Sequence, residues 1–160
     1  MPAARQARKN DRTPLRRAVA LLARREYSRA ELAWRLARDL PPESDGAEIE
    51  RVLDDLQARG MLSDVRFAQA LARTRGQRFG TARIRQELKE RGVADELVRS
   101  SVAALASTEL QRAQEVWRKR FGRPPATPEE RVRQMRFLSQ RGFEASVIVR
   151  VVGRATDDDR

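Results

Sequence analysis

The sequence contains neither cysteine nor histidine. Without cysteine there are no disulfides, thiol nucleophiles or thiolate metal sites, and without histidine the usual neutral-pH base and the most common metal ligand are missing. The stretch from Gly76 to Gly80 lacks both the spacing and the lysine of a GxxxxGK[ST] phosphate loop. Asp54 and Asp55 are adjacent, and adjacent helical positions diverge by about 100°, so this pair predicts an acidic surface turn. We therefore expect no catalytic residues, no metal site and no cofactor.

Large side chains and long apolar segments are also scarce. Aromatic residues make up 5% of the 160 residues, and no stretch has the apolar length of a membrane-spanning helix or the pattern of a signal peptide. We expect a soluble, cytoplasmic protein. With so few large side chains, small helical units bury little area apiece, so each unit is expected to depend on its neighbour.

Positive charge is abundant. The chain has 34 Lys and Arg residues against 23 Asp and Glu, which gives a formal net charge of +11 at pH 7. This balance favours a polyanionic partner, above all a nucleic acid, because each neutralised phosphate releases condensed counterions. Lysine occurs only at positions 9, 89 and 119. Genome base composition can explain that preference for arginine, but it does not by itself produce an excess of positive charge.

Two basic clusters stand out along the chain. Cations in a last helical turn complement the helix dipole, so part of each cluster has a structural explanation. More positive charge is present than capping requires, which indicates a surface for binding a partner; a solvated charged face is the alternative. The residues predicted to bind are Arg73, Arg75, Arg78, Arg83, Arg85 and Lys89 in the first cluster, and Arg118, Lys119, Arg120 and Arg123 in the second.

The segment from Gly80 to Val93 sets the pattern of the chain. Its Ile84 and Leu88 lie four residues apart on one helical face. Similar segments begin with capping boxes about fifty residues upstream, at Ser28, and about fifty residues downstream, at Thr127. Each is followed by an apolar ladder with helical spacing. The period indicates a repeated helical unit, although such a pattern can also arise by chance in a sequence rich in Arg, Ala and Leu.

Local signals predict where these helices begin and end. The hydroxyl of Thr81 can accept from the free amides of a first turn, which makes this residue the expected N-cap of its helix. Gly60, Gly92 and Gly142 each follow an arginine and are expected to end a helix in the left-handed conformation.

The spacing of apolar residues predicts which faces are buried. In the first helix, expected to begin at Pro14, Leu15, Val19 and Leu22 share one face. Both tryptophans, Trp34 and Trp117, are expected to pack in the core or between helices rather than to stack on nucleic-acid bases. The side chains expected to hold the units together are Leu32, Leu36, Phe67, Ile84, Leu88, Leu138 and Phe143.

Three segments carry a more specific pattern. The central one reads G-M-L-S-D-V-R-F-A from Gly60 and, after several basic residues, R-I-R-Q-E-L from Arg83. The others read R-R-E-Y-S-R-A-E-L from Arg24 and F-L-S-Q-R-G-F from Phe137. In this order, and within a match that runs from about residue 15 to residue 152, they resemble the bacterial RecX family of recombination regulators.

The resemblance implies an all-α fold, an elongated array of three tandem three-helix repeats. We place the repeats at residues 13–62, 63–106 and 107–153. A basic tail without apolar periodicity, expected to be disordered, precedes them over residues 1–12, and a polar tail follows them over residues 154–160.

The resemblance also implies a non-enzymatic function. Members of the family bind the RecA recombinase, especially its active filament on single-stranded DNA, and lodge in the groove of that filament. They block its extension or promote its loss, so that the ATPase, strand-exchange and co-protease activities of RecA fall. The expected partners are RecA and single-stranded DNA, with duplex DNA as a further candidate. The expected role of the protein, as a monomer, is the control of homologous recombination, DNA repair and the SOS response.

The main alternative is an autonomous DNA-binding protein of the helix-turn-helix type, such as a transcription factor. Small helical units with short turns are compatible with it. Against it, no helix combines Asn or Gln residues for base reading with flanking phosphate contacts, and no dimerisation segment is visible.

Overall fold

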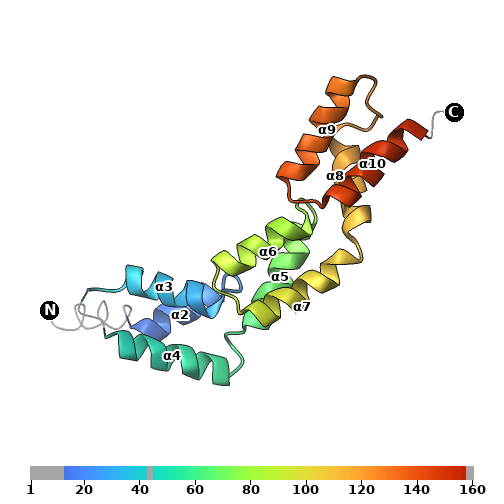
Figure 1. Ribbon diagram of the computed structural model, residues 1–160. Helices are drawn as coiled ribbons and strands as arrows, with labels where there is room; N and C mark the ends of the chain where they lie inside the picture. Colours follow the sequence, from blue (N-terminus) through green and yellow to red (C-terminus); the bar gives the residue numbers. More distant parts are fainter. Residues whose placement is uncertain (1–12, 43–44, 158–160) are drawn as a thin grey trace. The chain divides into compact units, whose positions relative to one another are not determined.

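The computed structural model describes the backbone of residues 13–42 and 45–157, and the side chains up to Gly153. Within these ranges all regular structure is helical and there is no strand (Figure 1), so the all-α prediction is confirmed. None of the described helices is long and apolar enough to span a bilayer. The helices are α2 (Pro14–Leu22), α3 (Arg29–Asp39), α4 (Gly46–Ala58), α5 (Asp64–Gly76), α6 (Thr81–Glu90), α7 (Asp95–Ala106), α8 (Glu109–Arg120), α9 (Pro128–Gln140) and α10 (Ala145–Asp157).

Three glycines end helices as predicted. Gly60, Gly92 and Gly142 follow α4, α6 and α9 with φ of 71°, 72° and 82°. Gly153 has no such positive φ, and α10 passes through it to Asp157, beyond the point at which we expected the polar tail to begin. The basic tail expected over residues 1–12 and the last three residues of the chain lie outside the described ranges.

The described chain divides into two compact units, and each is described by itself. The first comprises residues 13–42, 45–68 and 91–93, and the second comprises residues 69–90 and 94–157. Helix α5 begins in the first unit and ends in the second. The repeat boundaries stated above remain a prediction.

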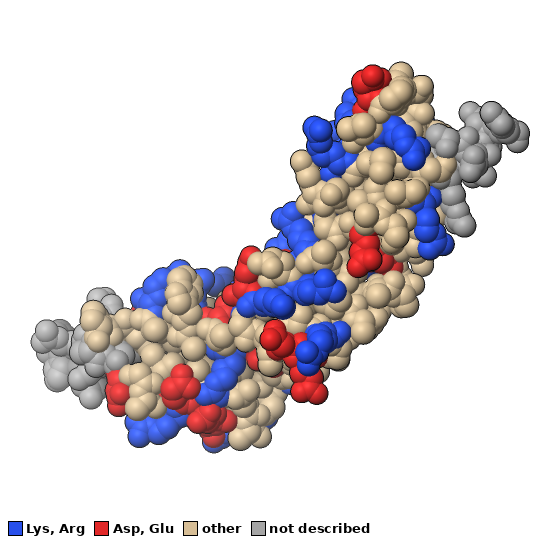
Figure 2. All heavy atoms as spheres, in the orientation of Figure 1, with Lys and Arg blue, Asp and Glu red and all other residues tan. Residues whose placement is uncertain are grey.

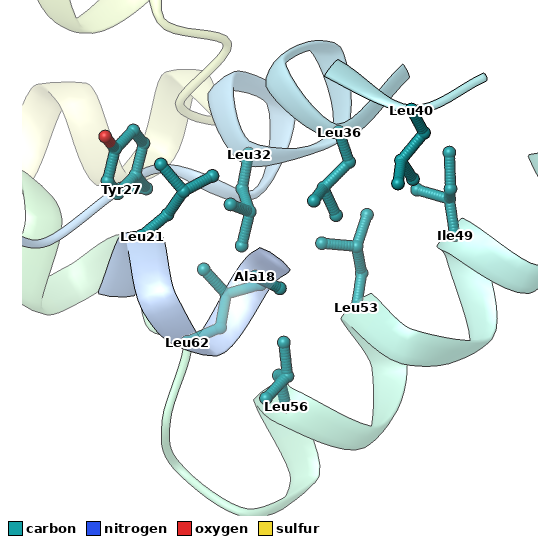
Figure 3. Packing of buried hydrophobic residues seen from close by; sticks show 10 residues of the cluster. All are labelled: Ala18, Leu21, Tyr27, Leu32, Leu36, Leu40, Ile49, Leu53, Leu56 and Leu62. Atoms are coloured by element: carbon teal, nitrogen blue, oxygen red, sulfur yellow. The ribbon is translucent and has the colours of Figure 1, made fainter. Parts of the chain in front are cut away.

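The core of the first unit lies between α2, α3 and α4 (Figure 3). Leu40 and Ile49 meet at one end of this cluster, and Tyr27 and Leu21 lie near each other at the other end. The hydroxyl of Ser28 caps α3 by accepting from the amide of Glu31 at 3.0 Å, as its capping box predicts. The buried residues of the cluster are Ala18, Leu21, Tyr27, Leu32, Leu36, Leu40, Ile49, Leu53, Leu56 and Leu62.

The predicted apolar face of the first helix is wrong. Leu15 is 45% exposed and Val19 is 37% exposed, whereas Ala18 and Leu21 are buried in the core. Two apolar faces compete on this short helix, and the small side chain of Ala18 is the one that lies inside the cluster. Only Leu22 of the predicted face packs against the core, where it is partly buried.

The prediction for the two tryptophans is half right. Trp34 is 61% exposed on α3, with the Arg38 guanidinium 4.8 Å from its ring centroid. Trp117 on α8 is half-buried and donates through Nε1 to Oε1 of Gln134 on α9, 2.8 Å away. It therefore packs between helices as expected. Helical spacing does not show which tryptophan lies on an uncovered face.

Residues 91–93 pack against the start of α3 in the first unit. The Ser28 hydroxyl donates to the carbonyl oxygen of Arg91 at 2.5 Å, and a β-carbon on Gly92 would lie only 2.5 Å from the β-carbon of Ala30. The Glu31 carboxylate forms ion pairs with the guanidinium groups of Arg25 at 2.7 Å and Arg91 at 2.8 Å. Burial alone would raise the pKa of Glu31, but the hydrogen bond from Arg25 and the charge of both arginines outweigh it, so its pKa is lowered.

The core of the second unit follows the predicted pattern. Ile84 and Leu88 of α6 and Val98 and Val102 of α7 are buried. A second cluster joins α8, α9 and α10 through Ala113, Val116, Leu138, Phe143, Ile148, Val151 and Val152. Thr127 caps α9 by accepting from the Glu130 amide at 3.2 Å. All seven side chains expected to hold the units together are buried.

The start of α6 differs from the prediction. Thr81 is the first residue of the helix rather than its N-cap, and its own amide donates to Oε1 of Glu109 at 3.2 Å. The same oxygen accepts from the Glu144 amide at 3.3 Å. Glu109 is only 4% exposed, so a buried carboxylate from α8 replaces the local cap. Sequence spacing could not reveal a cap that comes from another helix.

Candidate functional site

All ten basic residues predicted to bind a partner lie in the second unit, and all ten are exposed. They lie on α5, α6 and α8 and in the loops that follow α5 and α8. In the view of Figure 2, basic side chains are interspersed with acidic and neutral ones and do not form a uniformly basic face. The candidate binding surface is therefore defined by the contacts of individual residues and not by the net charge.

Phe79 organises the first basic cluster. Arg83 places its guanidinium 4.2 Å from the centroid of the Phe79 ring, and Arg75 and Arg141 each lie 5.7 Å from it. Such cation–π contacts fix the direction of the guanidinium groups while leaving their charge in place. Arg75 also pairs with Glu87 at 3.3 Å. Two arginines, each four residues from Phe79, and a third from the end of α9 are thus held around one ring.

The same pattern continues into the second cluster. Arg141 lies 4.5 Å from the centroid of Phe137, which meets Phe121 edge to face with ring centroids 5.3 Å apart. The Arg120 guanidinium lies 5.8 Å from the Phe121 ring. We call this series the arginine–phenylalanine seam; it consists of Arg75, Phe79, Arg83, Arg141, Phe137, Phe121 and Arg120.

Two backbone contacts support the seam. Arg141 donates to the carbonyl oxygen of Arg78 at 3.2 Å, and Arg83 lies 3.5 Å from that of Gln140. Through these contacts the loop after α5 and helix α6 are both tied to the end of α9. The seam links the two clusters that the sequence predicted separately.

Sequence reasoning missed the aromatic part of the site and the role of Arg141. Phe79, Phe121 and Phe137 each stand close in sequence to an arginine, which is a weak signal in a chain so rich in arginine. The contacts between Phe79 and Arg141 cross about sixty residues of sequence. No periodicity predicts them.

Several predicted residues stay outside the seam. In the described part of the chain, no carboxylate pairs with Arg73, Arg85, Arg118 or Lys119, and all four are exposed. Weak ion pairs hold Lys89 to Asp95 at 3.9 Å and Arg123 to Glu130 at 4.0 Å. The second unit therefore presents two kinds of cation: arginines positioned by aromatic rings, and cations free to meet an anionic partner.

The described residues show neither a metal-binding cluster nor an unpartnered buried polar side chain. They contain no group of three or more acidic side chains placed to hold a metal ion. Every buried side-chain nitrogen and oxygen among them has a hydrogen-bond partner. The chemistry supported by the site is the recognition of negative charge.

Comparisons with known proteins agree with the helical pattern. A family model described as "RecX, third three-helix domain" matches residues 107–152, and one described as "RecX, second three-helix domain" matches residues 63–101. The chain is 52% identical over 136 residues to the regulatory protein RecX of Leptothrix cholodnii, covering 85% of each sequence. It is 45% identical over 143 residues to that of Chromobacterium violaceum, covering 89% of this chain and 91% of the relative.

Solved structures support the fold. A crystal structure of RecX from Lactobacillus salivarius matches with a TM-score of 0.73 at 14% identity, covering 92% of this chain and 98% of that one. Another crystal structure of a regulatory protein RecX also matches with a TM-score of 0.73, at 18% identity, covering 95% of this chain and 77% of that one. At this level of identity the likeness concerns the fold alone.

Proposed function

We propose that this chain, which belongs to the RecX family, is a non-enzymatic cytoplasmic regulator of the RecA recombinase. It binds RecA and the RecA filament on single-stranded DNA. Binding lowers the ATPase, strand-exchange and co-protease activities of RecA and so controls recombination, DNA repair and the SOS response. The observation that carries the proposal is the 52% identity to a regulatory protein RecX across 85% of both sequences.

The surface of the second unit supports this proposal. Arg73, Arg85, Arg118 and Lys119 are exposed and have no carboxylate partner in the described part of the chain, so their charge is available to phosphates or acidic side chains. The seam holds further arginines in fixed directions beside them. We assign partner contacts to Arg73, Arg75, Arg78, Arg83, Arg85, Lys89, Arg118, Lys119, Arg120 and Arg123.

The test is the DNA-dependent ATPase rate of the cognate RecA on preformed filaments, titrated with this protein at moderate salt. We expect the rate to fall at well below one protein per RecA, because a regulator lodged in the filament acts on more than one subunit. Added free DNA should not relieve the effect, as it would if the protein only competed for DNA. An unchanged rate together with sequence-specific binding to duplex DNA would favour the helix-turn-helix alternative.

Charge reversal identifies the surface. Arg83 is a poor choice, because its ring contact and its proximity to Gly142 give it a structural role. The variant Arg73→Glu/Arg85→Glu changes two exposed cations and is expected to weaken inhibition. The matched control is Arg99→Glu/Arg150→Glu, which makes the same change of charge at exposed positions outside the predicted surface. Equal inhibition by both variants would refute the surface assignment.

A further inference from the structure

A cavity of about 440 Å³ lies beside the end of α8 and along α9, at one end of the arginine–phenylalanine seam. Its volume falls within the range of roughly 300–1,000 Å³ that is usual for small-molecule sites. The cavity belongs wholly to the second unit. Its lining consists of Arg120, Phe121, Arg123, Glu130, Arg133, Gln134, Arg136, Phe137 and Gln140.

The charge of the lining selects an anion. The lining contains four arginines and only one carboxylate, that of Glu130. This carboxylate already accepts from the Ala126 amide at 2.8 Å and pairs with Arg123. Arg133 and Arg136 are exposed, and no carboxylate of the described residues pairs with either. They lie three residues apart on α9, so they share one helical face. Guanidinium groups in such a pair match the oxygens of a phosphate.

The aromatic part of the lining selects a flat, apolar group beside that anion. Phe121 and Phe137 are half-buried and line the cavity, and Phe137 also packs against the core cluster of α8, α9 and α10. Their planes meet at 85° with the ring centroids 5.3 Å apart, so the two rings do not stack face to face on each other. The Arg141 guanidinium lies 4.5 Å from the centroid of Phe137, whereas that of Arg120 lies 5.8 Å from the centroid of Phe121, so Phe121 is the less closely covered ring. Aromatic rings in basic grooves stack on unpaired nucleobases.

The inner wall of the cavity is fixed before any ligand binds. Gln134 is only 2% exposed; its Oε1 accepts from Trp117 and its Nε2 donates to the Arg123 carbonyl oxygen at 3.3 Å. These bonds tie α9 to α8 and to the loop between them. A preorganised wall reduces the entropy that binding must overcome.

We propose that this cavity is a subsite for one nucleotide of a single-stranded nucleic acid. Arg133 and Arg136 bind its phosphate, and the base stacks on Phe121. The inference rests on the proposed function, because it names the DNA strand of the filament as the partner of this surface. A duplex would not fit the site, since its bases are stacked on one another. An acidic peptide would satisfy the arginines but would leave the aromatic ring without a role.

Direct binding of two labelled oligonucleotides tests the subsite. One is oligo(dT) of about twenty nucleotides, and the other has the same backbone without bases. We expect the full-length protein to bind the abasic strand about 5- to 150-fold more weakly, as for the loss of one stacked base. In Phe121→Leu, which keeps an apolar side chain without the ring face, this difference should disappear. Equal binding of both strands by the unaltered protein would overturn the proposal.

Salt dependence tests the phosphate contacts. Arg133→Gln/Arg136→Gln removes the contact to this one phosphate and should reduce the magnitude of the slope of log K against log salt by roughly 0.7, the value per phosphate on single strands. The control Arg99→Gln/Arg150→Gln should keep the slope. Unfolding curves must show that each variant is folded. The proposal is wrong if both variants have the same slope, or if poly-glutamate competes as well as the oligonucleotide and the abasic strand binds equally.

The RecA assay separates this proposal from the proposed function. If the protein inhibits the RecA ATPase but does not distinguish the two strands, the subsite is refuted and the regulatory function stands. If it distinguishes the strands through Phe121 but leaves RecA unaffected, the subsite stands and the regulatory function is refuted.

Discussion

The backbone of Gly80 lies directly against that of Gly142. The Gly80 amide donates to the carbonyl oxygen of Arg141 at 2.8 Å, and a β-carbon at position 80 would overlap the carbonyl group of Gly142. Gly142 itself has a φ of 82°, and a β-carbon there would come within 2.6 Å of that of Arg83. A glycine after α9 thus docks on the N-terminus of α6.

A related joint exists in the first unit. There the Ser28 hydroxyl takes the place of the Gly80 amide and donates to the carbonyl oxygen of Arg91, which precedes Gly92. In each joint an Arg-Gly pair after a helix meets the start of another helix. The repeated unit seen in the sequence is therefore also a repeated mode of packing.

The first prediction concerns the joint between Gly80 and Gly142. Gly80→Ala should destabilise the second unit by roughly 1–3 kcal/mol, because the added methyl group has no space. The measurement is the shift of the urea unfolding midpoint. As a control, Gly153→Ala adds the same methyl group inside α10, where nothing lies within 4 Å, and should stabilise by about 0.4–1 kcal/mol. Equal effects of the two substitutions would show that the close approach is absent.

The second prediction concerns the buried carboxylate of Glu109. Glu109→Ala should cost roughly 1–3 kcal/mol, because the buried amide of Thr81 loses its acceptor. Glu109→Gln keeps an oxygen in place and should cost less. Amide hydrogen exchange at Thr81 and Glu144 should accelerate in the alanine variant. The proposed cap is contradicted if exchange at both amides is unchanged.

The third prediction concerns pH and Glu31. Its lowered pKa means that the unfolded chain binds more protons, so this group stabilises the first unit fully above the ordinary glutamate pKa of about 4.3. That contribution is lost as the pH falls through the lowered pKa. Unfolding midpoints measured from about pH 6 to about pH 3 should fall less steeply for Glu31→Gln than for the unaltered protein. Parallel curves would exclude this role.

The fourth prediction contrasts the two tryptophans. Trp34→Ala should change the free energy of unfolding by no more than about 0.5 kcal/mol, because the side chain is largely exposed. Trp117→Ala should cost more than about 2 kcal/mol of unfolding free energy, because it removes half-buried packing and because Oε1 of Gln134 loses the N–H group that donates to it. Thermal unfolding of the two variants side by side measures the difference. A large loss for Trp34→Ala would mean that its face is covered in the folded protein.

The sequence by itself determined the features that depend on near neighbours along the chain. Ser28 and Thr127 cap their helices and Gly60, Gly92 and Gly142 end theirs, because these conformations depend on a few adjacent residues. The buried faces of α3 and α6 followed from spacing, since each helix has one clear apolar stripe. The absence of cysteine and histidine excluded disulfides, thiol nucleophiles and histidine bases or metal ligands. Three motifs in a fixed order indicated the family.

Only the tertiary structure decided the features that depend on which helices meet. Helix α2 has two apolar faces, and packing buries the face with Ala18 and Leu21 and leaves Leu15 and Val19 exposed. Packing also places Glu109 at the start of α6 and gathers Arg75, Arg83 and Arg141 around Phe79. Glu109 and Thr81 lie far apart in sequence, as do Arg141 and Phe79, so no periodic pattern relates them; only Arg75 and Arg83 lie near Phe79 along the chain. Their geometry is set by the packing of whole helices, which local sequence signals do not encode.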